Sequence, residues 1–253
     1  MKRVLGALFV LVCLGALATG GVWLWGRRPW RTAVSVNGRV LTAGELELRA
    51  QTLCDDAVRT KRLAIARGHE AEAVRSFRKE AAQMWIVKEV LLGEAVARGT
   101  TATQSDEKEA LAQAATRLKK RDLTVEDFFR EGPLPEELKR QDFREGMLIG
   151  LFMKKVVGEK VSVTPEEIDQ CVTRLKKLAA SSSAPALKTD RKTAINTLRT
   201  EKYNQGFRRV FRELFVKADV KCPMFPALES VDGVSPPRPE DASSGTAKGR
   251  SAP

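Results

Sequence analysis

The stretch from Ala33 to Ala50 combines a strand, a tight turn and the start of a helix, and it limits what the chain can fold into. Ala33 to Val36 alternates apolar and polar side chains, which is typical of a strand. Asn37-Gly38 readily takes the positive φ angles of a hairpin turn, and Arg39 to Leu41 would return as a second strand. Because so short a hairpin is not stable alone in water, the rest of the chain must supply a third strand or a bed of helices.

A helix is expected directly after this hairpin. Thr42 and Glu45 have the spacing of a capping box, in which each side chain bonds the exposed backbone N–H of the other residue. Apolar side chains then recur at helical spacing along one face, namely Leu46, Ala50, Leu53, Cys54 and Ala57. We expect this helix to run from Ala43 toward Arg67 and to pack through that face.

Most of the remaining body also shows a helical period, which predicts a mainly α fold. Further helices are expected over residues 70–98, 103–121, 125–131, 135–158, 164–180 and 190–217. Thr164-Pro165-Glu166-Glu167 is a strong helix start because it combines an N-cap, a proline at the first helical position and a glutamate at the third. Residues 219–222 are expected to form a short terminal strand beside the hairpin.

Changes in composition divide the chain into a body and two flanking segments. The body, residues 32–226, is long enough to bury a hydrophobic core. Within it, residues 179–188 contain a Ser/Pro-rich linker between the last two helices. From residue 227 the chain is rich in Pro, Ser and Gly, so residues 227–253 are predicted to be a disordered tail.

Residues 1–31 contain an apolar run from Val4 to Trp25, bounded on both sides by basic residues. This run is long enough to cross a bilayer core of about 30 Å. Ala16-Leu17-Ala18 resembles a signal-peptidase site, which would make the segment a cleaved signal peptide. The apolar run continues beyond that site, which favours an uncleaved anchor in the inner membrane. Both interpretations place the body in the periplasm.

The formal net charge is +12, and the excess of Lys and Arg extends through the body. The charge favours an anionic partner, although a solvated helical surface would have the same composition. Arg208, Arg209 and Arg212 are candidates for binding acidic polypeptide segments or anionic lipid headgroups. A nucleic-acid partner is not expected, because Tyr203 is the only tyrosine and no basic groove is interleaved with stacking aromatics.

Patterns typical of catalysis or metal binding are missing from the sequence. The chain contains one histidine, His69, and no phosphate-binding loop motif. Its four cysteines form no C-x-x-C pair, and they are Cys13, Cys54, Cys171 and Cys222. We therefore expect no catalytic residue, no metal and no cofactor, and at most one internal disulfide within the body.

Three stretches in order resemble the N-terminal chaperone domain of the SurA and parvulin-type foldase family. The first is the strand and turn Val34–Gly38 leading into Leu41–Leu46, and the second is Met84–Leu92 closing on Ala97-Arg98-Gly99. The third is Phe143–Ile149 followed by Val161–Ile168, which looks like the family's junction leading out of the helical domain. The resemblance covers roughly residues 33–220.

The resemblance implies an ATP-independent chaperone that binds unfolded exported polypeptides, including outer-membrane polypeptides. In that family a parvulin prolyl isomerase domain usually follows the junction. Here only Leu178 to Lys188 separates the two helices, and a domain cannot fit into eleven residues. We therefore expect no isomerase activity. The alternative is an envelope scaffold that binds one dedicated partner.

Client-binding candidates are large apolar side chains, because promiscuous binders use adaptable apolar surfaces. They are Met84, Trp85, Met147, Phe152, Met153, Phe207 and Phe211. Each could instead belong to the core. Trp85 and Met153 are the strongest candidates because each lies off the main apolar stripe of its helix. The linker before Asp190 could also let the last helix pack on a second copy, giving a homodimer.

Overall fold

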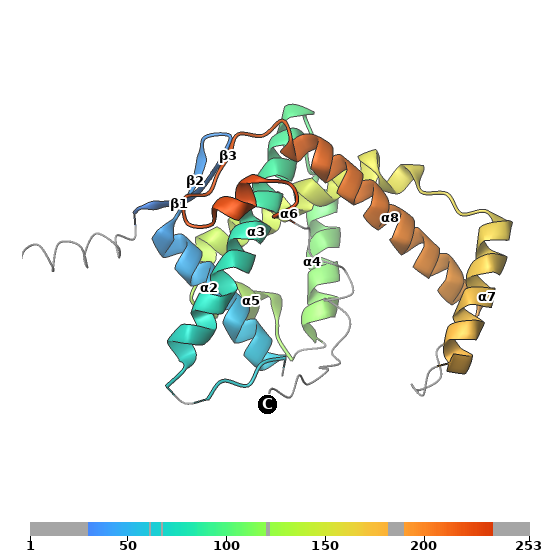
Figure 1. Cartoon of the computed structure of the whole chain (residues 1–253), viewed down its shortest axis with the longest axis horizontal. Helices are drawn as coiled ribbons and strands as arrows, with labels where there is room; N and C mark the ends of the chain where they lie inside the picture. Colours follow the sequence, from blue (N-terminus) through green and yellow to red (C-terminus); the bar gives the residue numbers. More distant parts are fainter. Residues whose placement is uncertain (1–29, 61, 67, 120–121, 182–189, 235–253) are drawn as a thin grey trace, which may run out of the picture.

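The computed structural model describes residues 30–60, 62–66, 68–119, 122–181 and 190–234. Over these residues the chain is mainly helical and carries a small three-stranded antiparallel sheet (Figure 1). A mainly α body with a minimal sheet is thus confirmed. The expected N-terminal membrane or signal helix lies outside the described residues, as do residues 182–188 of the linker and 235–253 of the tail. The first residues of the predicted linker, 179–181, belong to the preceding helix. Among the helices described, none is both long and apolar enough to cross a membrane.

The sheet has the order β2-β1-β3, with β1 (Thr32–Val36) in the centre between β2 (Arg39–Thr42) and β3 (Val220–Lys221). Asn37 and Gly38 form the turn at φ angles of 49° and 83°. The Asn37 side chain also accepts a 2.9 Å hydrogen bond from the Asp219 backbone N–H. The hairpin and its terminal partner strand are therefore confirmed, and the turn itself holds the third strand in place.

Helices make up the rest of the body. They are α2 (Ala43–Arg59), α3 (Glu70–Ala97), α4 (Gln104–Lys119), α5 (Val125–Arg130), α6 (Glu136–Val156), α7 (Pro165–Ser181) and α8 (Arg191–Phe215), with 3₁₀ turns η1 (Gly158–Lys160) and η2 (Pro226–Glu229). Thr42 caps α2 by accepting the Glu45 backbone N–H, as its spacing predicts. The reciprocal bond of a capping box is not formed, because the Glu45 carboxylate binds Arg49 instead.

Helix α2 ends earlier than the sequence predicts, at Arg59 rather than near Arg67. The Thr60 hydroxyl donates a 2.7 Å hydrogen bond to the Asp56 carbonyl. The backbone N–H groups of Arg62 and Leu63 turn back to the Ala57 carbonyl. Because these groups satisfy the carbonyls of the last turn, the chain leaves the helix although apolar residues continue.

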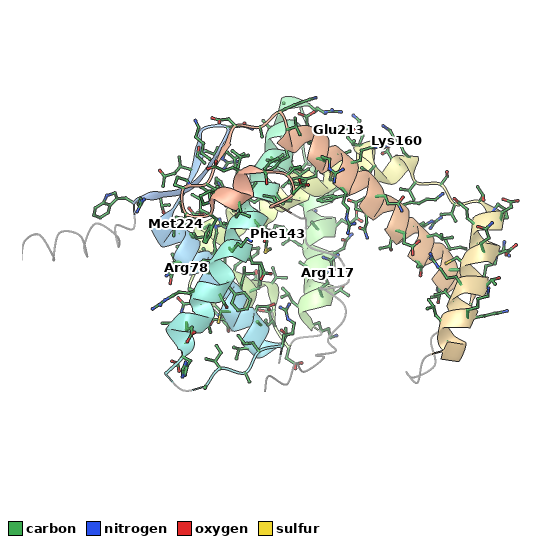
Figure 2. All side chains as sticks on the ribbon, viewed as in Figure 1. Arg78, Arg117, Phe143, Lys160, Glu213 and Met224 are labelled. Atoms are coloured by element: carbon green, nitrogen blue, oxygen red, sulfur yellow. The ribbon has the colours of Figure 1, made fainter. Side chains whose placement is uncertain are left out.

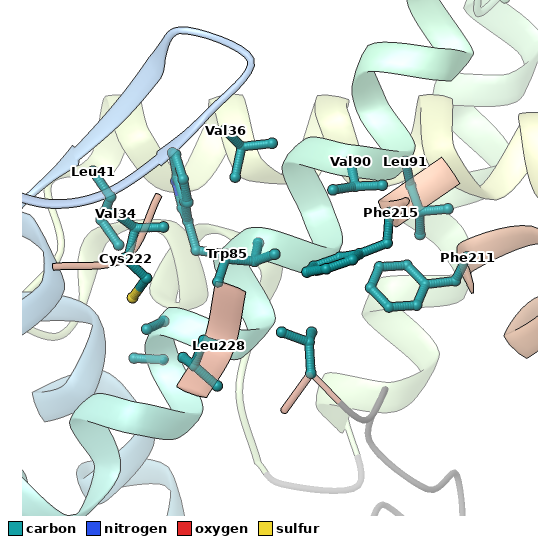
Figure 3. Close-up of a cluster of buried hydrophobic side chains, with 14 of the residues drawn as sticks. Val34, Val36, Leu41, Trp85, Val90, Leu91, Phe211, Phe215, Cys222 and Leu228 are labelled. Atoms are coloured by element: carbon teal, nitrogen blue, oxygen red, sulfur yellow. The ribbon is translucent and has the colours of Figure 1, made fainter. Parts of the chain in front are cut away.

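Helix α3 lies at the centre of the main core. It packs against α2, α6, α8 and β1. Figure 3 shows Val90 and Leu91 of α3 in one cluster with Phe211 and Phe215 of α8. Burial of this face from several sides holds the sheet and α8 to the same helix, so the body has one continuous core.

The segment after β3 also belongs to the body, which corrects the predicted boundary at residue 226. Leu228 and Val234 are 0% and 1% exposed and lie in the main core. The Gln83 side chain of α3 donates a 2.8 Å hydrogen bond to the Gly233 carbonyl. The Glu229 carboxylate accepts the Cys222 backbone N–H at 2.6 Å. Scattered apolar residues in a Pro- and Ser-rich sequence are enough here to order the chain as far as Val234.

Helices α7 and α8 form an arm that projects from the body (Figure 1). Thr164 and Glu167 cap the start of α7 reciprocally, confirming the predicted helix start. The arm has a small core of its own, formed by Ile168, Cys171, Leu175 and Ala194. The far end of α8 carries Phe211 and Phe215 into the main core, so one helix joins the arm to the body.

The three cysteines of the described body are buried, free thiols: Cys54, Cys171 and Cys222. Cys54 lies on the packed face of α2, Cys171 in the core of the arm and Cys222 in the main core. Burial raises the pKa of the Cys54 and Cys222 thiols. These positions make them small core side chains.

Candidate functional site

Four of the apolar residues predicted to contact a client lie in the core instead. Trp85 is 5% exposed, Phe152 2%, Met153 1% and Phe211 1%. Trp85 lies off the main stripe of α3, but α3 is covered by neighbours on more than one face, and Figure 3 shows the indole beside the sheet. A client cannot reach these side chains in this structure, so we withdraw them as contact residues.

The remaining apolar candidates lie on three different helices. Met84 of α3 is 45% exposed, whereas Met147 of α6 is half-buried. Phe207 of α8 is also half-buried, and its ring stacks on Phe211 at a centroid distance of 6.5 Å. The predicted cations Arg208, Arg209 and Arg212 are exposed on α8.

Two adjoining pockets form a more continuous apolar surface. One, of about 300 Å³, lies between α2, α5 and α6. The other, of about 350 Å³, lies between α4, α5 and α6. Phe128 and Phe143 line both pockets, so the two pockets adjoin at these rings, and we call the pair the aromatic groove. In Figure 2, Phe143 of α6 and Arg117 of α4 mark two elements that line its second half.

Three phenylalanine rings form the centre of the aromatic groove. Phe129 is buried and meets Phe128 and Phe143 edge-on, at centroid distances of 5.5 and 5.7 Å. The Arg140 guanidinium lies 4.5 Å from the centroid of the Phe129 ring. Phe129 thus anchors the cluster in the favoured aromatic geometry, while Phe128 remains 44% exposed at the surface.

Polar caps at both ends hold the short helix α5 that presents Phe128. At its start, Thr124 and Asp127 form a capping box. At its end, the Lys139 ammonium of α6 donates hydrogen bonds to the Phe128 and Glu131 carbonyls. Lys139 is buried, and this burial lowers its pKa although Glu131 acts in the opposite direction. Because Lys139 satisfies carbonyls that would otherwise face the groove, α5 can end against an apolar surface.

An ion cluster at the edge of the groove holds α6 to α2, α3 and β2. The Lys88 ammonium of α3 lies 2.8 Å from Asp142 Oδ1 and 2.6 Å from Glu145 Oε2. Arg49 of α2 binds both Asp142 oxygens, at 2.7 and 3.2 Å. Arg39 of β2 donates a 3.0 Å hydrogen bond to Glu145. Asp142 and Glu145 flank Phe143 in sequence, so the cluster sets the position of the Phe143 ring.

The acids of this cluster differ in their electrostatics. Burial alone would raise the pKa of Asp142 and of Glu145. Hydrogen bonds from Arg49 and Lys88 lower the pKa of Asp142. Hydrogen bonds from Lys88, Gln141 and Arg39 lower the pKa of Glu145. The pKa of Glu89 is raised because burial outweighs its attraction to Lys88 and Arg39. Glu89 Oε2 lies 2.8 Å from Arg39 Nη1, yet the contact lacks hydrogen-bond geometry, which leaves that oxygen incompletely satisfied.

The aromatic residues of the groove were not among the predicted contact residues. The sequence predicts a helix over residues 125–131, but Phe128 and Phe129 are adjacent there and do not define a helical stripe. Phe143 fits an apolar stripe of α6, so its pattern alone predicts core. An adjacent Phe-Phe pair on a helix too short to bury both rings is the one signal that could have indicated an exposed aromatic.

Comparison with models of known protein families and with curated proteins finds no match to this chain. The interpretation of the aromatic groove therefore depends on its geometry and chemistry.

Proposed function

We propose that this protein is an ATP-independent, chaperone-like protein that binds non-native polypeptide segments in the aromatic groove. The observation that carries the proposal is the pair of adjoining pockets that share Phe128 and Phe143, with Phe128 44% exposed. Concave apolar surface that is open to solvent is typical of binding sites. An unfolded chain offers apolar side chains that such a surface accepts.

The rim of the groove supports a polypeptide ligand over a small apolar one. Arg59 and Glu131 line the first half beside Phe128, and Arg117 lines the second. Charges of both signs around an apolar floor suit a chain whose apolar side chains alternate with polar groups. Binding of many sequences would require shallow contacts of this kind rather than one deep pocket.

The proposal includes a body of the SurA N-terminal type without prolyl isomerase activity. Helix α7 ends at Ser181 and α8 begins at Arg191, which leaves no room for an isomerase domain between them. It also includes an inner-membrane anchor, or a cleaved export signal, that places the body in the periplasm. That part is based on the apolar run of residues 4–25.

The test measures aggregation of several unrelated proteins diluted from urea, by light scattering, with and without the full chain in phospholipid nanodiscs. Empty nanodiscs are the control, and the measurement is made at about 0.05 and 0.5 M salt, which spans weak and strong screening. Protection of many clients at both salt concentrations is expected. Protection of none would overturn the proposal and favour a scaffold for one dedicated partner.

Three variants show which surface is responsible. Phe128→Ser should abolish most of the protection, because it removes the exposed ring of the groove. Val40→Thr, a shape-conserving change at a residue 49% exposed on β2, should leave it unchanged. Met84→Gln tests the other candidate contact residue that is exposed, because Met84 of α3 is as exposed as Phe128. Loss of protection with Met84→Gln but not Phe128→Ser would move the site to the outer face of α3.

A further inference from the structure

A basic pocket lies at the corner where α6 ends and α8 passes over it. It has a volume of about 450 Å³, and its lining includes three valines and the polar residues Lys160, Ser162, Lys202, Gln205 and Arg209. Lys160 comes from η1, whereas Lys202 and Arg209 come from α8, more than forty residues later. Figure 2 shows Lys160 close to the α8 ribbon at this corner. The fold thus gathers basic residues that are distant in sequence.

Both walls of this pocket are held in place. A Cβ on Gly206 would lie 2.5 Å from Val157 Cγ1, so α8 packs closely on the end of α6 only because residue 206 is glycine. The Lys202 ammonium donates a 2.7 Å hydrogen bond to the Ser162 carbonyl and also contacts the Glu167 carboxylate at 2.7 Å. These contacts tie the link after η1 to α8, so the pocket does not depend on a ligand for its shape.

The charges at the pocket are not balanced. Lys202 has Glu167 as its counterion. Among the described residues, neither Lys160 nor Arg209 forms an ion pair with a carboxylate. Helix α8 carries seven basic residues against two acidic ones, and Glu213 is the acid nearest to Arg209 in sequence. The acid beside Lys160 in sequence is Glu159. Two cations without a carboxylate partner at one pocket favour an anion there.

We propose that this pocket binds a phosphate-bearing group. A phosphate presents several strong acceptor oxygens and up to two negative charges, which match one guanidinium, one ammonium and the donors of Gln205 and Ser162. Arginine can bind two phosphate oxygens side by side, while lysine contributes a point charge. The phosphate can belong to a lipid headgroup or to a free metabolite. The proposal is independent of the aromatic groove, because the pocket and the groove share no lining residue.

Isothermal titration calorimetry of the full chain at low salt tests the site with two probes, inorganic phosphate and glycerol 3-phosphate, a headgroup fragment. The Lys160→Met/Arg209→Met variant should bind the preferred probe at least tenfold more weakly. The control, Lys192→Met/Arg199→Met, removes the same charge from exposed positions of α8 outside the pocket. It should bind within twofold of the unaltered protein. All these side chains are exposed, and circular dichroism checks that the variants remain folded.

Tighter binding of glycerol 3-phosphate would support the site and favour a glycerol phosphate, as found in lipid headgroups, as its ligand. Tighter binding of inorganic phosphate would support the site and identify a free phosphate compound. Binding of neither probe would overturn the proposal. Equal weakening in both variants would also overturn it, because the net charge of α8 and not the pocket would then attract the anion.

Discussion

The Lys88 ammonium of α3 lies 2.8 Å from Oδ1 of Asp142, a residue of α6 that lines the aromatic groove. The same carboxylate binds Arg49 of α2, so one acid joins three helices. The neighbouring residue, Phe143, lines both halves of the groove. The ion cluster therefore has a packing consequence, because it fixes the helix that presents the aromatic ring.

Replacing Lys88 with methionine should destabilise the body substantially. The change leaves Asp142 and Glu145 partly buried without one of their cations, and breaking such a pair costs about 3 kcal/mol. Urea unfolding followed by circular dichroism measures the loss. The control is Arg191→Met, which removes an exposed pair with Asp169 and should cost less than about 1 kcal/mol. Equal losses in the two variants would show that the cluster contributes no more than a surface pair.

The cluster also predicts a loss of stability in acid. The pKa values of Asp142 and Glu145 are lower in the folded chain than their ordinary values of 3.8 and 4.5. Both groups bind fewer protons in the folded chain than in the unfolded chain. Their contribution to the free energy of unfolding is therefore fully present above their ordinary pKa values and is lost as the pH falls through their folded pKa values. Urea unfolding free energies measured from pH 7 downward should therefore fall below about pH 4.5. Asp142→Asn should make the unfolding free energy fall less steeply with decreasing pH. An unchanged slope would show that Asp142 does not contribute to the loss of stability in acid.

Glu89 should have the opposite pH dependence. The pKa of Glu89 is raised in the folded chain above its ordinary value of 4.5. The contribution of Glu89 to the free energy of unfolding is therefore present below pH 4.5 and is lost as the pH rises through the folded pKa. Glu89→Gln imitates the protonated form and does not titrate. The stability of this variant relative to the unaltered protein should increase as the pH rises across that window. A difference that stays constant with pH, in the same urea experiment, would show that burial does not disfavour the Glu89 charge.

Local signals in the sequence predict much of this fold because they act over a few residues. Thr42 with Glu45 and Thr164 with Glu167 predict helix starts that the structure confirms. Asn37-Gly38 predicts the turn in the same way. The two helix starts depend on hydrogen bonds within their own segments, and the turn depends on the positive φ angles that Asn-Gly readily takes. No knowledge of the remaining chain is needed for either.

Burial of the larger side chains could not be predicted in the same way. Trp85 is in the core because the sheet and neighbouring helices cover more than one face of α3. Val234 is buried where the Gln83 side chain holds the chain at Gly233. Phe128 remains exposed because α5 is too short to bury both of its rings. These outcomes depend on contacts between residues distant in sequence, which helical periodicity does not report.

Two glycine substitutions should have opposite effects on stability. Gly206→Ala places a Cβ 2.5 Å from Val157 Cγ1, and such overpacking costs about 1–3 kcal/mol. Gly150→Ala, within α6, meets nothing within 4 Å and should stabilise the helix by about 0.5–1 kcal/mol. Thermal unfolding of both variants shows whether each substitution raises or lowers the melting temperature. Adding Val157→Ala to Gly206→Ala should give less loss than the sum of the two single changes, because the pair is in contact. Strict additivity would contradict the close packing.

Helix α4 should exchange its amide hydrogens faster than α3. It forms a wall of the aromatic groove, yet none of its residues is buried, whereas α3 buries nine. Helices with few buried contacts open at a lower free energy than core helices. Hydrogen exchange followed by mass spectrometry should show peptides of α4 deuterated well before those of residues 81–95 of α3. Equal protection would mean that contacts along the groove hold α4 as firmly as the core holds α3. Faster exchange would give the groove a movable wall, which suits clients of different sizes.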